Sequence, residues 1–228
     1  MRLYWIRHGQ MQMRASRARD AALIERVFNQ EEQRGLSPRG EREAERVGAL
    51  LARTGVDALY ASPLLRARET AEIATRSLGL PVHIHAEVAE LRTGRLAPGS
   101  LGARLVERVT KAPVGERAKL AILGPMLVPL YYREWARGRT VGGETPQELS
   151  ARIDAFVRML RETHAPGARV AIVAHGYLIL TMARTIRRGA ADTLRILRSP
   201  YIPNGSVTEI VADPGGLRLV RFADSSHL

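Results

Sequence analysis

Two apolar segments of this chain each end at a histidine followed by a glycine. The first, Leu3–Ile6, runs through Arg7 into His8-Gly9, and the second, Arg169–Ala174, runs into His175-Gly176. Short apolar runs of this kind are typical of strands buried on both faces, as in a parallel sheet covered by helices. Open α/β sheets place their chemistry at the carboxyl ends of the strands. The pattern therefore predicts an α/β fold with functional side chains directly after its strands.

The remaining segments alternate between helix and strand signals. Ser37 and Pro38 form an N-cap followed by proline at the first helical position, and Thr145 with Glu148 forms a capping box. This order predicts a mostly parallel central sheet with helices on both faces. We expect strands at residues 2–7, 57–61, 82–85 and 169–174, helices at 37–53, 63–78, 145–163 and from 176 onward, and a terminal hairpin of 206–211 and 217–222.

Residues 97–140 interrupt this alternation. They are typical of two or three helices joined by loops, and we expect them to form a helical cap insertion within one domain of residues 1–228. An insertion that follows a strand of the sheet is a natural lid or substrate-selecting element. Its apolar stretch at 120–130 can contact substrate, pack the cap on the core or bind a second copy of the chain. Residues 15–33 are expected to be helical or partly mobile.

The composition excludes several classes of protein. The chain contains no cysteine, which rules out disulfides, thiolate metal sites and cysteine nucleophiles. Its first residues become charged too soon for a signal peptide. Its longest apolar stretch, residues 120–132, is shorter than the ~20 residues that a membrane-spanning helix needs. We therefore expect a cytoplasmic protein that does not bind membranes.

The formal net charge is +12, and nearly all of the positive charge comes from arginine. Such a charge can attract an anionic partner such as a phosphate ester or a nucleic acid. It can equally reflect arginines spread over solvated helix faces among acidic residues, which the stretch 34–53 favours. No basic platform with interleaved aromatic residues accompanies it, so we expect no nucleic-acid partner.

Four motifs occur in order along the chain: Arg7-His8-Gly9-Gln10, the segment 59–71 (LYASPLLRARETA), Glu90 four residues ahead of Gly94, and Val173-Ala174-His175-Gly176. Arg-His-Gly alone arises by chance in many proteins. Together and in this order, the motifs resemble those of the histidine phosphatase superfamily, also called the phosphoglycerate-mutase-like family. The resemblance spans residue 1 to about residue 212.

The resemblance implies a role for each matching residue. His8 would be the nucleophile that forms a phosphohistidine, and His175 the second pocket histidine, which offsets charge on the phosphoryl group. Gly9 would let the backbone approach the phosphate. Arg7 and Arg66 would clamp the phosphate, because guanidinium groups match phosphate geometry bidentately and stay charged at any working pH. Such a mechanism requires neither metal nor cofactor.

The sequence offers two candidates for the proton donor. Glu90 matches the family's spacing of a glutamate four residues ahead of a glycine, and Glu87 is a nearby competitor. A general acid at this place needs a raised pKa, which burial beside the cap would supply. The resemblance thus points to Glu90 and leaves Glu87 open.

Gln10 can donate its side-chain amide to phosphate. Many family members carry a threonine and then an asparagine after this point, where the chain has Met11 and Met13, so the donors on the far side of the phosphate are left undefined. Gly143-Glu144 resembles the family's Gly-Glu ahead of its later helix. Glu144 either bridges to a pocket arginine or only precedes the helix.

The pattern favours a metal-independent phosphatase that acts on a small phosphate monoester. A phosphoglycerate mutase and a catalytically idle relative that binds a phosphorylated ligand or a protein remain alternatives, and a homodimer is left open. His83 and His85 share one face of a strand, but no third ligand stands out nearby, so we expect a solvated strand face there rather than a metal site.

Overall fold

The computed structural model describes residues 1–12, 34–113, 115, 129–198 and 202–228. The chain divides into two compact units. The described residues of the first lie within 1–90 and 153–228, and those of the second lie within 91–152. The sequence predictions for residues 15–33 and for most of the apolar stretch 120–130 fall outside the described residues.

The elements of the first unit follow the predicted order closely. They are β1 (Arg2–Arg7), α2 (Pro38–Thr54), β2 (Ala58–Ala61), α3 (Leu65–Thr75), β3 (Val82–Ile84), the 3-10 turn η2 (Ala86–Val88), most of α6 (Pro146–Thr163), β6 (Arg169–Ala174), α7 (Gly176–Ile186), α8 (Gly189–Arg198), β7 (Val207–Asp213) and β8 (Gly216–Asp224). The terminal hairpin is longer than expected, and α8 is a separate helix that the sequence analysis did not distinguish.

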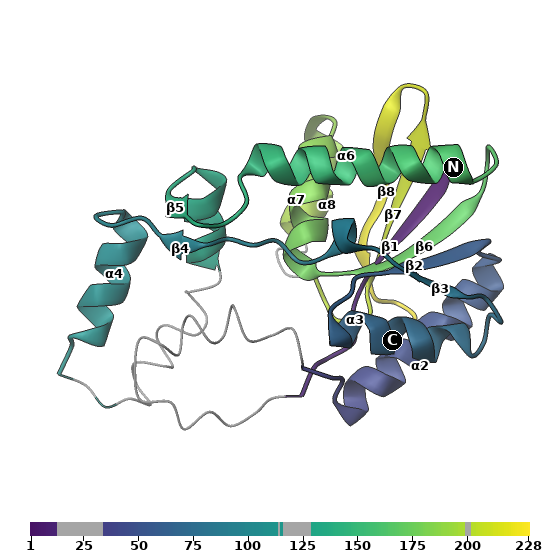
Figure 1. Ribbon diagram of the computed structural model, residues 1–228, viewed down its shortest axis with the longest axis horizontal. Helices are drawn as coiled ribbons and strands as arrows, with labels where there is room; N and C mark the ends of the chain where they lie inside the picture. The colour runs from purple at the N-terminus through teal and green to yellow at the C-terminus, as the bar shows by residue number, and fades with distance from the viewer. Residues whose placement is uncertain (13–33, 114, 116–128, 199–201) are drawn as a thin grey trace. The chain divides into compact units, whose positions relative to one another are not determined.

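A six-stranded sheet in the order β3-β2-β6-β1-β7-β8 forms the centre of this unit (Figure 1). β3, β2, β6 and β1 run parallel, and β7 and β8 are antiparallel. β6 lies between β1 and β2, so the carboxyl ends of three parallel strands meet at one edge. The predicted mostly parallel sheet is confirmed.

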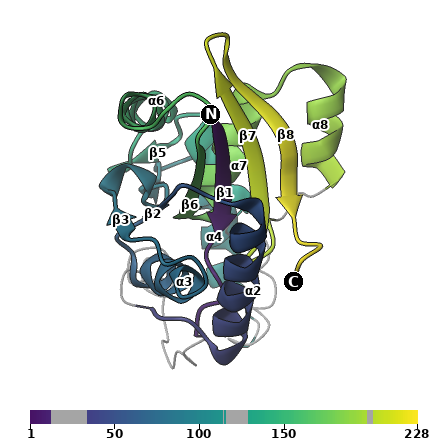
Figure 2. The same cartoon turned by 90° about the vertical axis from the view of Figure 1, so that its right-hand side faces the viewer.

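Helices cover both faces of this sheet. α2 and α3 lie side by side on one face (Figure 2), where Ile6, Leu59 and Val173 pack against Val47 and Leu51 of α2. Side chains alternate along a strand, so Trp5 points to the opposite face, where its ring contacts Phe156 of α6 with centroids 6.0 Å apart. The sheet is thus buried on both sides, which explains the continuous apolar runs of β1 and β6.

Local signals fix most helix starts. The Ser37 hydroxyl accepts the Gly40 N–H with Pro38 at the first helical position, as predicted. The predicted start of α3 at Pro63 is wrong: the helix begins at Leu65 because Leu64 is still extended, with φ −68° and ψ 135°. α3 also ends at Thr75, three residues before the expected end. Residues 76–78 form a turn that leads to Gly79, which has a positive φ.

The second unit contains α4 (Leu101–Thr110), a helical segment at residues 129–136, the start of α6 and two strands. The strands, β4 (Arg95–Leu96) and β5 (Thr140–Val141), pair antiparallel and were not predicted. The capping box at the start of α6 is confirmed, since the Glu148 carboxylate accepts the Thr145 N–H at 2.7 Å and the Thr145 hydroxyl accepts the Glu148 N–H at 3.1 Å. Among the described residues, no helix combines the length and apolarity required to span a membrane.

Candidate active site

The two histidines and the serine that follow the parallel strands come together at the carboxyl edge of the sheet. Arg7, the last residue of β1, is level with Ala174 of β6, and Ala61 of β2 is level with Val173. The residues that come next in the chain are His8, His175 and Ser62, and all three are buried. The two imidazole rings have centroids 5.2 Å apart. Strand register alone therefore assembles the centre of the site.

His8 is held with one ring nitrogen protonated and the other available as a nucleophile. Its Nδ1 lies 2.8 Å from the Gly9 carbonyl oxygen, which can only accept, so Nδ1 carries the proton. Its Nε2 accepts a hydrogen bond from Arg66 Nε at 3.1 Å and therefore presents a lone pair. Burial holds the pKa of His8 well below its usual 6.5, and the charges of Arg66 and Arg7 lower it further. A neutral imidazole is the form that can attack phosphorus.

Arg66 joins the two histidines. It lies in the first turn of α3, and only 2% of its surface is exposed. While its Nε donates to His8, its Nη2 lies 3.2 Å from His175 Nδ1. A guanidinium has no acceptor, so this nitrogen of His175 also presents a lone pair. One cation thus faces two unprotonated ring nitrogens at the place where an anion would be bound.

His175 is fixed from its other side by Ser62. The Nε2 of His175 lies 2.8 Å from the Ser62 hydroxyl oxygen, and both side chains are fully buried. Because Nδ1 accepts from Arg66, the neutral ring must carry its proton on Nε2 and donate it to Ser62. The Leu64 N–H also donates to the Ser62 oxygen, at 3.3 Å.

The backbone after His8 is held by contacts from distant parts of the chain. The Gly9 N–H donates to the buried Thr70 hydroxyl at 3.0 Å, and Thr70 donates in turn to the Arg66 carbonyl at 2.7 Å. The Asn204 amide donates to the His8 carbonyl at 2.9 Å. These bonds fix the peptide between His8 and Gly9 relative to the helix that carries Arg66.

Packing inside the protein requires glycine at position 9. Its φ is not positive, and a Cβ placed on it would lie 2.5 Å from the Gly40 carbonyl oxygen. The close approach that excludes a side chain is to the first turn of α2. The expected approach of the Gly9 backbone to phosphate stays a prediction.

Arg7 and Gln10 are both near the site but make different contacts. Arg7 Nη1 donates to the Ile202 carbonyl, and its Nε lies 3.3 Å from where a Cβ on Gly176 would be. The Gln10 amide oxygen accepts the Ser37 hydroxyl at 2.9 Å, which leaves the amide nitrogen as the group that can donate to phosphate.

The structure separates the two candidate acids. The Glu90 carboxylate accepts the backbone N–H groups of Leu178 at 3.0 Å and Tyr177 at 3.4 Å, in the first turn of α7 directly after His175. The Glu87 carboxylate instead binds His85 Nδ1 at 2.5 Å, and the side chains of this pair are 39% and 34% exposed. Of the two candidates, Glu90 is therefore the one whose carboxylate is held by the backbone N–H groups that follow His175 in the chain.

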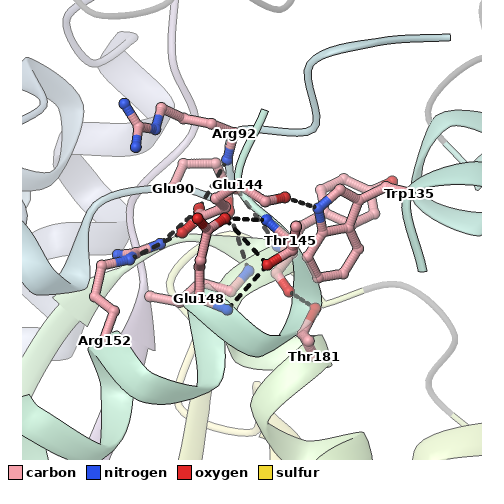
Figure 3. Close-up of polar contacts among 10 residues, drawn as sticks. Glu90, Arg92, Trp135, Glu144, Thr145, Glu148, Arg152 and Thr181 are labelled. Carbon is pink, nitrogen blue, oxygen red and sulfur yellow. Dashed lines mark hydrogen bonds and ion pairs between the residues drawn. The ribbon is translucent and has the colours of Figure 1, made fainter. Parts of the chain in front are cut away.

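Glu144 belongs to the second unit and binds arginines there (Figure 3). Its carboxylate pairs with Arg152 through two contacts of 2.8 and 3.1 Å and also accepts the Arg92 N–H at 3.0 Å. The Trp135 ring N–H donates to the Glu144 carbonyl at 2.5 Å. Glu144 therefore pairs with an arginine, but this arginine is Arg152 of its own unit and not the predicted pocket arginines Arg7 and Arg66.

His83 and His85 pack around an aromatic ring. Their rings lie 5.1 and 6.1 Å from that of Tyr60, whose hydroxyl contacts His164 Nε2 at 2.9 Å. Within the described ranges, no three histidine, aspartate or glutamate side chains gather as a group that could hold a metal ion.

Sequence reasoning missed the contributions of Ser62 and Thr70. Both belong to the motif that contains Arg66, four residues before and four residues after it. The spacing of Thr70 from Arg66 is one helical turn, which was the available signal. Their partners, His175 and Gly9, lie 113 and 61 residues away in the chain, and only the fold brings them together.

Comparison with known proteins gives a consistent family. A family model described as the histidine phosphatase superfamily (branch 1) matches residues 3–119 and 125–225. A Klebsiella pneumoniae protein named "Probable phosphoglycerate mutase GpmB" is 29% identical over 226 residues, which cover 93% of each chain. The protein of the same name from Salmonella agona is 28% identical over 210 residues, 92% of this chain and 84% of the relative.

Solved structures with this fold include two named phosphatases. A mycobacterial glucosyl-3-phosphoglycerate phosphatase aligns with a TM-score of 0.67 at 23% identity, over 98% of this chain and 99% of its own. An alpha-ribazole phosphatase from Shigella flexneri aligns with a TM-score of 0.61 at 24% identity, over 98% and 96%. At these identities the likeness shows the α/β fold and does not extend to the reaction.

Proposed function

Because the chain belongs to the histidine phosphatase superfamily, we propose that it hydrolyses a phosphate monoester without a metal ion, through a phosphohistidine on His8. The observation that carries the proposal is the neutral, buried His8 ring whose Nε2 lone pair faces Arg66. A nucleophile needs that lone pair, and the arginine beside it supplies the positive charge that a phosphoryl group requires.

In the first step, His8 Nε2 attacks phosphorus and the bond from phosphorus to the ester oxygen breaks. Arg66 must transfer its N–H donors from the two histidines to the phosphoryl oxygens, which frees His8 Nε2 for attack. Arg7 adds a second guanidinium, and Gln10 can donate its amide. Two cations around a group that carries negative charge in the transition state are the main source of stabilisation in such a reaction.

The leaving oxygen needs a proton, and Glu90 is the proposed donor. It would give its proton to the departing alkoxide and recover one from the water that cleaves the phosphohistidine. The two N–H donors of α7 hold this carboxylate in place beside His175. These donors suit the ionised form, which is the form that must take a proton from water in the second step.

Hydrolysis is favoured over mutase chemistry by the chain after Glu90. That stretch is short and reaches Leu96-Ala97-Pro98-Gly99 quickly, whereas the mutases carry a longer, charged stretch and an extended basic cap sequence. The names of the curated relatives favour phosphoglycerate transfer as the second candidate. Incubation with 3-phosphoglycerate distinguishes them, because a mutase forms 2-phosphoglycerate and a phosphatase releases inorganic phosphate.

The first test is hydrolysis of an aryl phosphate in the presence of a chelator. We expect turnover by the wild type and a loss of roughly 10⁴-fold or more in His8→Ala. His83→Ala is the matched control, since this exposed histidine packs on Tyr60. Turnover in His8→Ala at the wild-type rate would end the covalent mechanism, and no turnover in any variant would favour a phospho-ligand-binding role.

The proton donor is tested by comparing leaving groups. Glu90→Gln should slow alkyl phosphates, whose leaving groups need a proton, much more than activated aryl phosphates. Glu87→Gln is the control, because its carboxylate pairs with His85. An equal loss on both substrate types in Glu90→Gln would argue against proton donation by this residue.

A further inference from the structure

Ser62 is a fully buried side chain that the mechanism above does not use. Its hydroxyl oxygen lies 2.8 Å from His175 Nε2 and also accepts the Leu64 N–H at 3.3 Å. Arg66 Nη2 faces His175 Nδ1 at 3.2 Å, so the neutral ring carries its proton on Nε2 and the Ser62 oxygen accepts that N–H. Ser62 is thus the partner of the protonated nitrogen of His175.

We propose that Ser62 is a positioning residue that keeps His175 in the tautomer protonated on Nε2, so that Nδ1 is the atom that exchanges a proton with the phosphoryl group. This inference rests on the proposed phosphatase function. In the empty site, Arg66 and Ser62 both enforce this tautomer, because Arg66 Nη2 is directed at Nδ1 from 3.2 Å. Once phosphate draws the Arg66 donors away, the contact between Ser62 and Nε2 on the other side of the ring still favours this tautomer.

The tautomer matters because of what Nδ1 can then do. A phosphate monoester near neutral pH is partly singly protonated, and an unprotonated Nδ1 can take that proton from the phosphoryl oxygen. The resulting imidazolium donates Nδ1–H back to the same oxygen and Nε2–H to Ser62, and it returns the proton when inorganic phosphate leaves. A ring protonated on Nδ1 instead would place an N–H against the Arg66 donors and would leave Nε2 to accept from Ser62.

The direct measurement is the ¹⁵N spectrum of the histidine rings, recorded with and without inorganic phosphate. The His175 signals are those missing in His175→Gln. We expect a protonated Nε2 and an unprotonated Nδ1 in the free wild type. A protonated Nδ1 with an unprotonated Nε2 would overturn the proposal without any variant, and it would do so whether or not the protein hydrolyses phosphate esters.

With phosphate bound at a pH high enough that the phosphate carries no proton, the His175 ring stays neutral, and there Ser62→Ala should leave its two tautomers mixed. The variant should also lower kcat about tenfold, with KM changed less than about threefold. Ser206→Ala is the matched control: Ser206 is a buried serine at 1% exposure whose hydroxyl makes no hydrogen bond within the described chain. Ser62→Thr keeps the hydroxyl and should restore both readouts.

Two outcomes contradict the assignment. A single Nε2-protonated tautomer and a wild-type kcat in Ser62→Ala would show that Ser62 does not set the ring. A loss of kcat in Ser62→Ala that Ser206→Ala shares in equal measure would show only the effect of a cavity. If the wild type has no turnover, the proposed function fails, while the tautomer measurement still decides the role of Ser62.

Discussion

Replacing Thr70 by valine tests how the backbone after His8 is held. Valine has nearly the shape of threonine, so packing on α3 is retained and the change is confined to the hydroxyl. In the native protein, this hydroxyl accepts the Gly9 N–H at 3.0 Å and donates to the Arg66 carbonyl at 2.7 Å, and it is fully buried.

The two bonds do not cost the same when they are lost. The Arg66 carbonyl lies inside α3 and keeps the N–H donor of its own helix. The Gly9 N–H has no such second partner in a helix and becomes a buried donor without an acceptor, which costs about 1–3 kcal/mol. We therefore expect Thr70→Val to lower the free energy of unfolding by about 2 kcal/mol.

Activity should fall as well, because Gly9 also supplies the carbonyl that orients the His8 ring. A shift of this peptide displaces Nε2 from its line of attack, and a displacement of ~1 Å can cost about 10²-fold in rate. We expect kcat to drop about 10- to 100-fold, and Thr70→Ser, which keeps the hydroxyl, to recover most of it.

Urea unfolding and aryl phosphate hydrolysis measure the two effects. Thr75→Val is the control, because Thr75 lies at the other end of α3 and its hydroxyl donates to the Leu80 carbonyl. If Thr70→Val unfolds within about 0.5 kcal/mol of the wild type and keeps its kcat, the bond to Gly9 does not hold the nucleophile.

Three further predictions follow from the geometry. Burial lowers the pKa of His8, and the charges of Arg66 and Arg7 lower it further, so NMR should show a neutral ring at pH values just below 6.5. The unfolded chain binds this proton at a higher pH than the folded protein does, so His8 should make the fold less stable as the pH falls below 6.5. A His8 ring that titrates at 6.5 in the folded protein would contradict this. Arg66→Lys replaces the two nitrogens that contact His8 and His175 with a single one and loses the planar fork that matches phosphate, so it should lower kcat/KM about 10²-fold. Arg68→Lys on the exposed side of α3 should not, and an equal effect of the two would count against the clamp. Gly40→Ala should destabilise the protein by more than about 2 kcal/mol in urea unfolding because its Cβ would overlap the backbone of Gln10. A value equal to that of Gly115→Ala, whose Cβ would meet no atom of the described residues within 4 Å, would contradict this packing.

The sequence was most informative where one local pattern determined one feature. The apolar runs ahead of His8 and His175 predicted the central strands, and the caps at Ser37 and Thr145 predicted two helix starts correctly. Arg66 was expected in the first turn of its helix and is there, although the helix begins two residues later than predicted. In each case, the controlling interactions lie within a few residues of the feature.

Features that depend on distant contacts could not be predicted in this way. The pairing of β4 with β5 brings Gly94 and Gly143 backbone to backbone, so close that neither could carry a Cβ. Two-residue strands have no periodicity to detect. The contacts of Ser62 and Thr70 likewise depend on His175 and Gly9, which lie 113 and 61 residues away in the chain, so the residues around Ser62 and Thr70 could not predict these partners.

The central claim is that phosphate passes through a covalent bond to His8, and trapping the intermediate tests it most directly. The enzyme is mixed rapidly with a fast aryl phosphate, quenched in alkali and digested, and the phosphorylated peptide is located by mass spectrometry. Phosphate on the ring of His8, absent from His8→Ala, is the predicted result. Turnover without any phosphorylated histidine, or with the phosphate on a different residue, would contradict the account.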